Sequence, residues 1–119
     1  MSKANESVLV VEDDAALREA LVDTLHAAGL PALAAADAPG ALQLLQNEEI
    51  ALVISDVQMP GPIDGAGVAL LMREQRPDMP IVVTSGHGIP TPLPTGGRFV
   101  AKPYDNRKVV SLLTDLLAA

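Results

Sequence analysis

Short apolar runs that alternate with segments of helical periodicity are the feature that most restricts how this chain can fold. The runs are residues 8–11, 33–35, 52–55, 81–83 and 99–101. Continuous apolar runs of this length are typical of strands buried on both faces. Strands that alternate with helices form parallel sheets with right-handed crossovers. The pattern therefore predicts an α/β fold, a doubly wound five-stranded parallel sheet. For such a sheet we expect the flavodoxin-like strand order 2-1-3-4-5.

The segments between the strands carry apolar residues at helical spacing. After Asp14 the leucines Leu17, Leu21 and Leu25 recur at this spacing, so we expect them on the inner face of a helix that ends at Gly29. Asp14 is interpreted as the cap of this helix, without a role in chemistry. Further helices are expected after the cap Asp37, from about Gly65 to Gln75, and after the cap Asp105.

The connection between the fourth and fifth strands is unusually short. It runs from Gly86 to Gly97 and contains Pro90, Pro92 and Pro94. About a dozen residues is the least that a parallel crossover needs, and prolines disrupt the interior of a helix. We therefore expect at most a short helical turn here, so that the fourth helix of the fold is short or absent.

Length and composition indicate one domain spanning residues 1–119. This length is enough to bury a core without disulfides, and the chain has no cysteine. No apolar run approaches the roughly 20 residues of a membrane span. The short polar start lacks the apolar core of a secretory signal, so we expect a cytoplasmic protein. The initial Met1 and the end of the chain at the last helix favour a stand-alone domain.

Charge excludes several classes of partner. The net charge is −7, and lysines and arginines form no cluster. Binding to nucleic acid or to a membrane surface requires a basic patch, so neither is expected. One Phe and one Tyr are too few for base stacking. The expected partners are proteins or small phosphates.

Polar residues follow the predicted strands where parallel strands share an edge. Glu12 and Asp13 follow the first strand, Asp56 the third, Thr84 the fourth and Lys102 the fifth. Because the first and third strands are neighbours in the predicted order, their acids should meet. Crowded carboxylates need positive charge, which Lys102 and a divalent cation with oxygen ligands, Mg²⁺ or Mn²⁺, would supply. This combination suits phosphoryl transfer to Asp56.

Four motifs resemble the response-regulator receiver domain of two-component signalling, over essentially the whole chain. Each motif alone is weak, but four in this order and spacing are highly specific. They are Val8-Leu9-Val10-Val11-Glu12-Asp13-Asp14, Ser55-Asp56-Val57-Gln58-Met59-Pro60-Gly61, Val82-Val83-Thr84-Ser85-Gly86 and Ala101-Lys102-Pro103-Tyr104.

The resemblance implies a role for each matching residue. Asp56 would be the phosphoacceptor, and Lys102 would pair with the phosphoryl group. Mg²⁺ would be bound directly by Asp13, through water by Glu12, and by Asp56 together with the main-chain carbonyl of Gln58. Thr84 would be the switch hydroxyl and Phe99 the switch aromatic. The Lys102–Pro103 bond would be cis.

The implied function is that of a phosphoacceptor in a phosphorelay. A sensor histidine kinase or a histidine phosphotransfer protein would donate the phosphoryl group, and output would be by protein contact or by phosphate relay. Such a domain acylates and dephosphorylates itself but turns over no external substrate, so we do not expect an enzyme in that sense.

Three departures from the family pattern stand out. Phe99 replaces the commoner tyrosine, so switching cannot use a phenol hydroxyl. Residues 59–65 hold one extra residue before the Asp-Gly turn. The short proline-rich connection replaces most of the fourth helix, and the family's mode of dimerisation is therefore not carried over.

Three other functions are compatible with the predicted fold. An aspartyl-phosphate phosphohydrolase of the haloacid-dehalogenase type has a second acid two residues after the nucleophile, where this chain has Gln58. A flavin or nucleotide module needs a glycine-rich loop after the first strand, where Glu12, Asp13 and Asp14 would repel a phosphate. A receiver-like scaffold that works without phosphate stays open, although the complete set of site residues argues against it.

Overall fold

The computed structural model of this chain describes residues 6–57, 65–86 and 97–118. Its strands pair in parallel in the order β2-β1-β3-β4-β5, which confirms the predicted fold and strand order. The elements in chain order are β1 (Ser7–Val11), α1 (Ala15–Ala27), β2 (Ala32–Ala35), α2 (Ala38–Asn47), β3 (Ile50–Asp56), α3 (Gly65–Gln75), β4 (Ile81–Ser85), β5 (Arg98–Ala101) and α4 (Asn106–Ala118).

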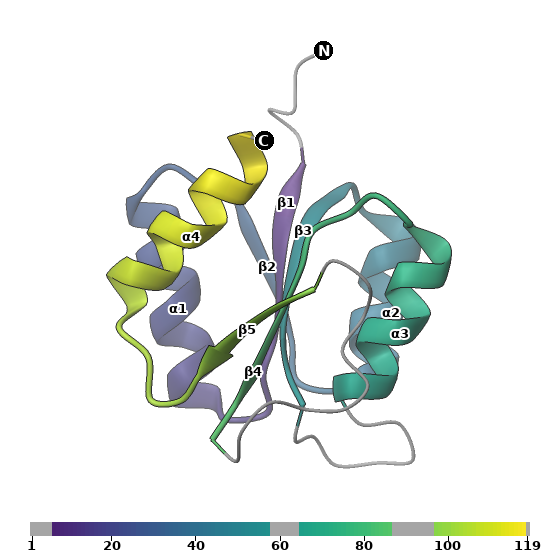
Figure 1. Cartoon of the computed structure of the whole chain (residues 1–119), viewed down its shortest axis with the longest axis horizontal. Coiled ribbons are helices and arrows are strands. Elements are labelled where there is room, and N and C mark those ends of the chain that lie inside the picture. Colours follow the sequence, from purple (N-terminus) through teal and green to yellow (C-terminus); the bar gives the residue numbers. More distant parts are fainter. Residues whose placement is uncertain (1–5, 58–64, 87–96, 119) are drawn as a thin grey trace.

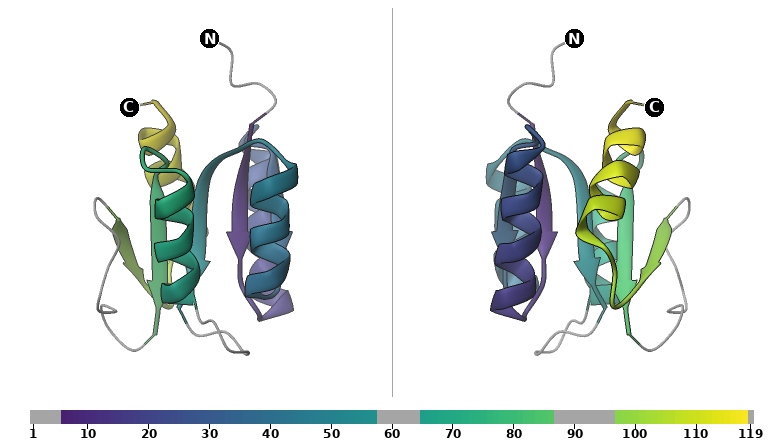
Figure 2. Two further views of the ribbon diagram at one scale, coloured as in Figure 1. Left: turned by 90° about the vertical axis from the view of Figure 1, so that its right-hand side faces the viewer. Right: turned by 90° about the vertical axis from the view of Figure 1, so that its left-hand side faces the viewer.

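The described helices cover both faces of the sheet. α1 and α4 pack together on one face, and α2 and α3 pack together on the other (Figure 1). The two side views look onto these two faces, one onto α2 and α3 and the other onto α1 and α4 (Figure 2). Both faces of the central strands are therefore buried, as their continuous apolar sequences predict.

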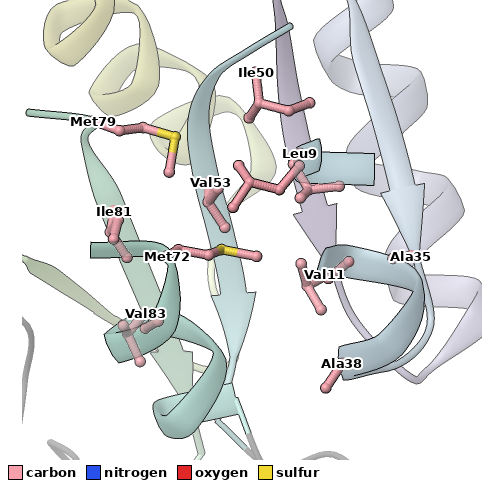
Figure 3. Close-up of a cluster of buried hydrophobic side chains, with 13 residues drawn as sticks. Leu9, Val11, Ala35, Ala38, Ile50, Val53, Met72, Met79, Ile81 and Val83 are labelled. Atoms are coloured by element: carbon pink, nitrogen blue, oxygen red, sulfur yellow. The ribbon is translucent and has the colours of Figure 1, made fainter. Parts of the chain in front are cut away.

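Alternate residues of β1 enter two separate cores. Leu9 and Val11 of β1 point toward α2 and α3, where they join Val53, Met72 and others (Figure 3). Val8 and Val10 point the other way and pack with residues of α1 and α4. The side chains of a strand alternate between its faces, so one apolar run supplies both cores. Burial of these runs is the main stabilising contribution to the fold.

Aspartate caps fix where the helices begin. The Asp14 side chain accepts a hydrogen bond from the Leu17 amide at 3.1 Å, and Asp37 accepts one from the Gly40 amide at 2.9 Å. Such caps satisfy amides that have no partner within the helix. Gly29 follows α1 with a φ of 81°, a left-handed conformation that glycine adopts without strain.

Two sequence expectations need correction. Leu17 was expected on the inner face of its helix, but it is 43% exposed. The buried stripe of α1 begins only at Leu21, and Leu17 lines a surface cavity together with Lys102 and Tyr104. In addition, β3 and β4 are longer than predicted, so that Asp56 and Thr84 belong to the strands themselves.

Two further expectations concern the connections and the membrane. The predicted short turn between β4 and β5 falls on residues 87–96, outside the described part of the chain. Among the residues that the structure describes, no helix is both long enough and apolar enough to cross a membrane.

Candidate functional site

The carboxyl ends of β1 and β3 lie side by side and bring three acids together (Figure 1). Val11, the last residue of β1, is in register with Ser55, so Glu12 and Asp13 continue beside Asp56. One carboxylate oxygen from each of these three acids lies within 4.8 Å of the other two. Glu12 and Asp56 are buried, whereas Asp13 is exposed. The predicted meeting of acids at this edge is therefore present.

Lys102 brings positive charge to this cluster from the end of β5. Its Nζ donates to Glu12 Oε1 at 2.6 Å and lies 3.2 Å from Asp56 Oδ2. The Lys102 amide donates to the Ser85 carbonyl at 2.9 Å, which ties the main chain of this residue to β4. The Lys102–Pro103 peptide bond is cis, as predicted.

The ionisation of Glu12 and Lys102 follows from burial and pairing. Burial has the largest effect on Glu12 and raises the pKa of its carboxyl, although hydrogen bonds from Lys102 and the Asp14 amide oppose the rise. Burial is the largest single effect on Lys102 and disfavours its ammonium, but hydrogen bonds to Glu12 and Asp56, together with the attraction of their charges, raise the pKa of Lys102. The lysine is therefore charged at neutral pH.

Two buried hydroxyl residues flank Asp56. Thr84 pairs with Asp56 across β3 and β4, and its carbonyl accepts from the Val57 amide at 3.0 Å. Ser55 lies directly before the acid, and its Oγ donates to the Asp56 carbonyl at 3.1 Å. The predicted place of Thr84 beside Asp56 is therefore present, whereas the hydrogen bond made by Ser55 was not foreseen.

The remaining predicted residues lie elsewhere. Phe99 is half-buried in β5, where it pairs with Val83 rather than with a residue of the acid cluster. Gln58, the expected source of a main-chain ligand, lies outside the described residues. The Asp14 carboxylate caps α1, as expected.

Arg18 is a member of this region that sequence reasoning did not identify. From α1 its Nη1 donates to the Glu12 carbonyl at 2.9 Å, and it lies 3.5 Å from the Asp13 carbonyl. The side chain thus reaches back over six residues to the turn that carries two of the acids. Nothing in the apolar periodicity of the helix marks such a contact.

A surface cavity of about 340 Å³ adjoins the cluster on the side of Lys102. Its walls come from α1, from the end of β4 and from the segment that joins β5 to α4. They are formed by Leu17, Gly86, Lys102, Pro103, Tyr104 and Asn106. Lys102, which contacts Asp56, therefore also lines this cavity.

The three acids suit a divalent cation that prefers oxygen ligands. Glu12, Asp13 and Asp56 carry three negative charges when ionised, and Lys102 balances one of them. Mg²⁺ typically uses one or two protein carboxylates and keeps several waters, for which the exposed Asp13 leaves access. The donor set therefore fits Mg²⁺.

Comparison with known proteins points to one family. The sequence model of the response regulator receiver domain matches residues 8–114. The response regulator protein FleR of Pseudomonas aeruginosa is 38% identical over 111 residues, which cover 89% of this chain and 23% of FleR. The C4-dicarboxylate transport transcriptional regulatory protein DctD of Rhizobium meliloti is 35% identical over 112 residues. Those residues cover 90% of this chain and 24% of DctD, so the chain spans about a quarter of the length of such relatives.

Comparison with solved structures points to the same family. The receiver domain of the hybrid histidine kinase CckA is 34% identical and superposes with a TM-score of 0.82, covering 93% of this chain and 98% of that one. The response regulator TrrA of Thermotoga maritima, solved in complex with Mg²⁺–BeF, is 25% identical with a TM-score of 0.84 and the same coverage of both chains.

Proposed function

The chain belongs to the response regulator receiver family, and from this membership we propose that residues 1–119 form the phosphoacceptor domain of a two-component phosphorelay. Receiver domains of this family are signalling modules rather than enzymes that turn over substrates. In this proposal Asp56 accepts a phosphoryl group from a phosphohistidine of a sensor histidine kinase or a phosphotransfer protein. The observation that carries the proposal is the contact of the buried Asp56 with Lys102, beside Glu12 and Asp13.

The side chains of Glu12, Asp13 and Asp56, with the main-chain carbonyl of Gln58, would hold Mg²⁺. A bound Mg²⁺ supplies positive charge that offsets the charge of the phosphoryl oxygens. The Mg²⁺–BeF complex of TrrA supports this assignment by similarity. Because Asp13 is the exposed member of the set, it lies where a hydrated ion enters.

The transfer itself needs little covalent chemistry from the protein. An Asp56 oxygen attacks phosphorus in line, and an O–P bond forms as the N–P bond to the imidazole breaks. The electron pair of the N–P bond stays on that nitrogen, and neutral imidazole leaves because its other ring nitrogen already carries a proton. Lys102 pairs with a phosphoryl oxygen, and the Thr84 hydroxyl donates to another. Attack of water on phosphorus later restores Asp56 and releases phosphate.

The signal would pass from the site to the surface through Thr84 and Phe99. Thr84 turns toward the phosphoryl group, and Phe99 changes its position in response. Since Phe99 has no hydroxyl, this change depends on packing alone. Output would be contact with a protein partner or onward relay of the phosphoryl group.

The intact mass of the protein tests this function. After incubation with phosphoramidate, a small donor with an N–P bond, wild type should gain the mass of one phosphoryl group only with Mg²⁺. Asp56→Asn should gain none, whereas the matched control Asp14→Asn, an acid that caps α1, should behave as wild type. A folded wild type that gains no mass, or an Asp56→Asn variant that still does, would refute the proposal. In the first case a receiver-like scaffold that works without phosphate would replace it.

A further inference from the structure

Arg18 contacts main-chain carbonyls of the acidic turn rather than its carboxylates, and we infer that Arg18 is a positioning residue that holds Glu12 and Asp13 in their metal-binding arrangement. The inference rests on the proposed metal site. Its basis is the hydrogen bond of 2.9 Å from Arg18 Nη1 to the Glu12 carbonyl, with the Asp13 carbonyl 3.5 Å away. Arg18 is half-buried, so this contact is partly shielded from water.

The carbonyls of this turn need a partner because the sheet has ended. Val11 is the last residue of β1 that pairs with both neighbouring strands, and the Glu12 amide still donates to the Ala35 carbonyl at 3.0 Å. The Glu12 carbonyl has no place in these strand ladders. A buried or half-buried carbonyl without a partner is unfavourable, and Arg18 supplies that partner from the first turns of α1.

Hydrogen bonds to the carboxylate fix the side chain of Glu12 but not that of Asp13. The Glu12 carboxylate is held by Lys102 at 2.6 Å and by the Asp14 amide at 3.1 Å. For Asp13, by contrast, no residue of the described chain donates a hydrogen bond to the exposed carboxylate. The direction of the Asp13 side chain therefore depends on the main chain at residues 12 and 13, where the guanidinium binds. Arg18 thus acts on the acid that has the least support of its own.

Because Arg18 is charged, the direction in which metal affinity changes on its removal tests the inference. A positive charge near a cation site weakens cation binding, so a role through charge alone predicts tighter metal binding when Arg18 is removed. A role in positioning predicts weaker binding, because the carboxylates lose their arrangement. The two roles therefore predict opposite changes.

The experiment measures Mn²⁺ binding from the electron paramagnetic resonance signal of free Mn²⁺, with Mg²⁺ as competitor. Groups that orient metal ligands change affinity by about 10- to 100-fold when removed, and we expect the lower end, roughly a tenfold weaker affinity, for Arg18→Met. Arg18→Lys keeps the charge and can donate to one carbonyl, so it should recover part of the loss. The matched control Arg98→Met removes an equal charge from an exposed position on β5 and should bind as wild type does.

Amide hydrogen exchange without metal provides a second readout. The Asp14 amide donates to the Glu12 carboxylate within the same turn, so it should exchange faster in Arg18→Met while the amides of the central strands stay protected. Equal or tighter Mn²⁺ binding by folded Arg18→Met would overturn the inference. If that variant does not fold, Arg18→Ala, which also removes the donor, replaces it, and equal or tighter Mn²⁺ binding by folded Arg18→Ala would equally overturn the inference.

The failure of this inference can be told from failure of the proposed function. If wild type binds Mn²⁺ and Arg18→Met binds it more weakly, the inference stands even when Asp56 accepts no phosphoryl group. If wild type binds no Mn²⁺, both the metal site and the inference fall.

Discussion

At the scale of single residues, Glu12 carries its charge in an unfavourable environment. Its carboxyl is buried and lies beside Asp56, and burial raises its pKa above the ordinary 4.5 despite the hydrogen bonds from Lys102 and the Asp14 amide. A raised pKa means that the folded protein holds this proton more tightly than the unfolded chain does. The stabilising contribution of Glu12 is therefore complete below pH 4.5 and is lost as the pH rises through the folded-state pKa.

Glu12→Gln should therefore stabilise the metal-free protein at neutral pH. The amide removes a buried charge but keeps an oxygen that accepts from Lys102, so the free energy of unfolding should rise by on the order of 1 kcal/mol. The dependence of stability on pH above 4.5 should become flatter. Urea unfolding followed by circular dichroism measures both effects. A lower stability at neutral pH would mean that the ion pair with Lys102 outweighs the cost of burying the charge.

At the scale of elements, the helix caps are the contacts that sequence identified most directly. Asp14 and Asp37 each accept a hydrogen bond from an amide three residues further on. Replacement of either by Ala should lower the free energy of unfolding by about 1 kcal/mol. Asp14→Ala should nevertheless keep the Mg²⁺-dependent phosphoryl adduct, because its carboxylate serves α1. Loss of the adduct in a folded Asp14→Ala variant would show that this acid belongs to the site.

The elements also show what sequence can and cannot predict. Apolar runs and helical spacing were sufficient for the strands and the described helices, because these features follow from burial of repeating patterns. The strand order came from the common order of doubly wound sheets rather than from any periodicity. The strand order in turn placed Glu12, Asp56 and Lys102 at one edge before any contact was known. Leu17 was misplaced because periodicity does not tell where a helix stops facing the sheet.

Contacts that depend on one side chain reaching a particular main-chain atom were not predictable. Arg18 binds carbonyls of the preceding turn, and Arg73 of α3 similarly donates to the Met79 carbonyl at 2.6 Å. The Ser55 hydroxyl turns to the carbonyl of its own neighbour. Such bonds depend on side-chain rotamers and local geometry, which leave no periodic signal in the sequence.

At the scale of the whole molecule, the acid cluster of a chain with net charge −7 should make stability responsive to a divalent cation. A ligand that binds only the folded state stabilises it, by about 1.4 kcal/mol at ten times its Kd. Mg²⁺ should therefore raise the melting temperature of wild type beyond what an equal ionic strength of NaCl does. The melting temperature of Asp13→Asn should change equally with Mg²⁺ and with NaCl of the same ionic strength. If the melting temperature of wild type also changes equally with Mg²⁺ and with NaCl, the cluster does not bind Mg²⁺.

The central claim is that the Asp56 carboxylate becomes an acyl phosphate, and its most direct test is chemical trapping. The protein is treated with phosphoramidate and Mg²⁺ and reduced with borohydride, which converts an aspartyl phosphate to homoserine, and the peptides are then sequenced by mass spectrometry. The account predicts homoserine at position 56, only when Mg²⁺ is present. Reduction at Glu12 or Asp13 instead, or no reduced residue in a folded and phosphoramidate-treated protein, would contradict it.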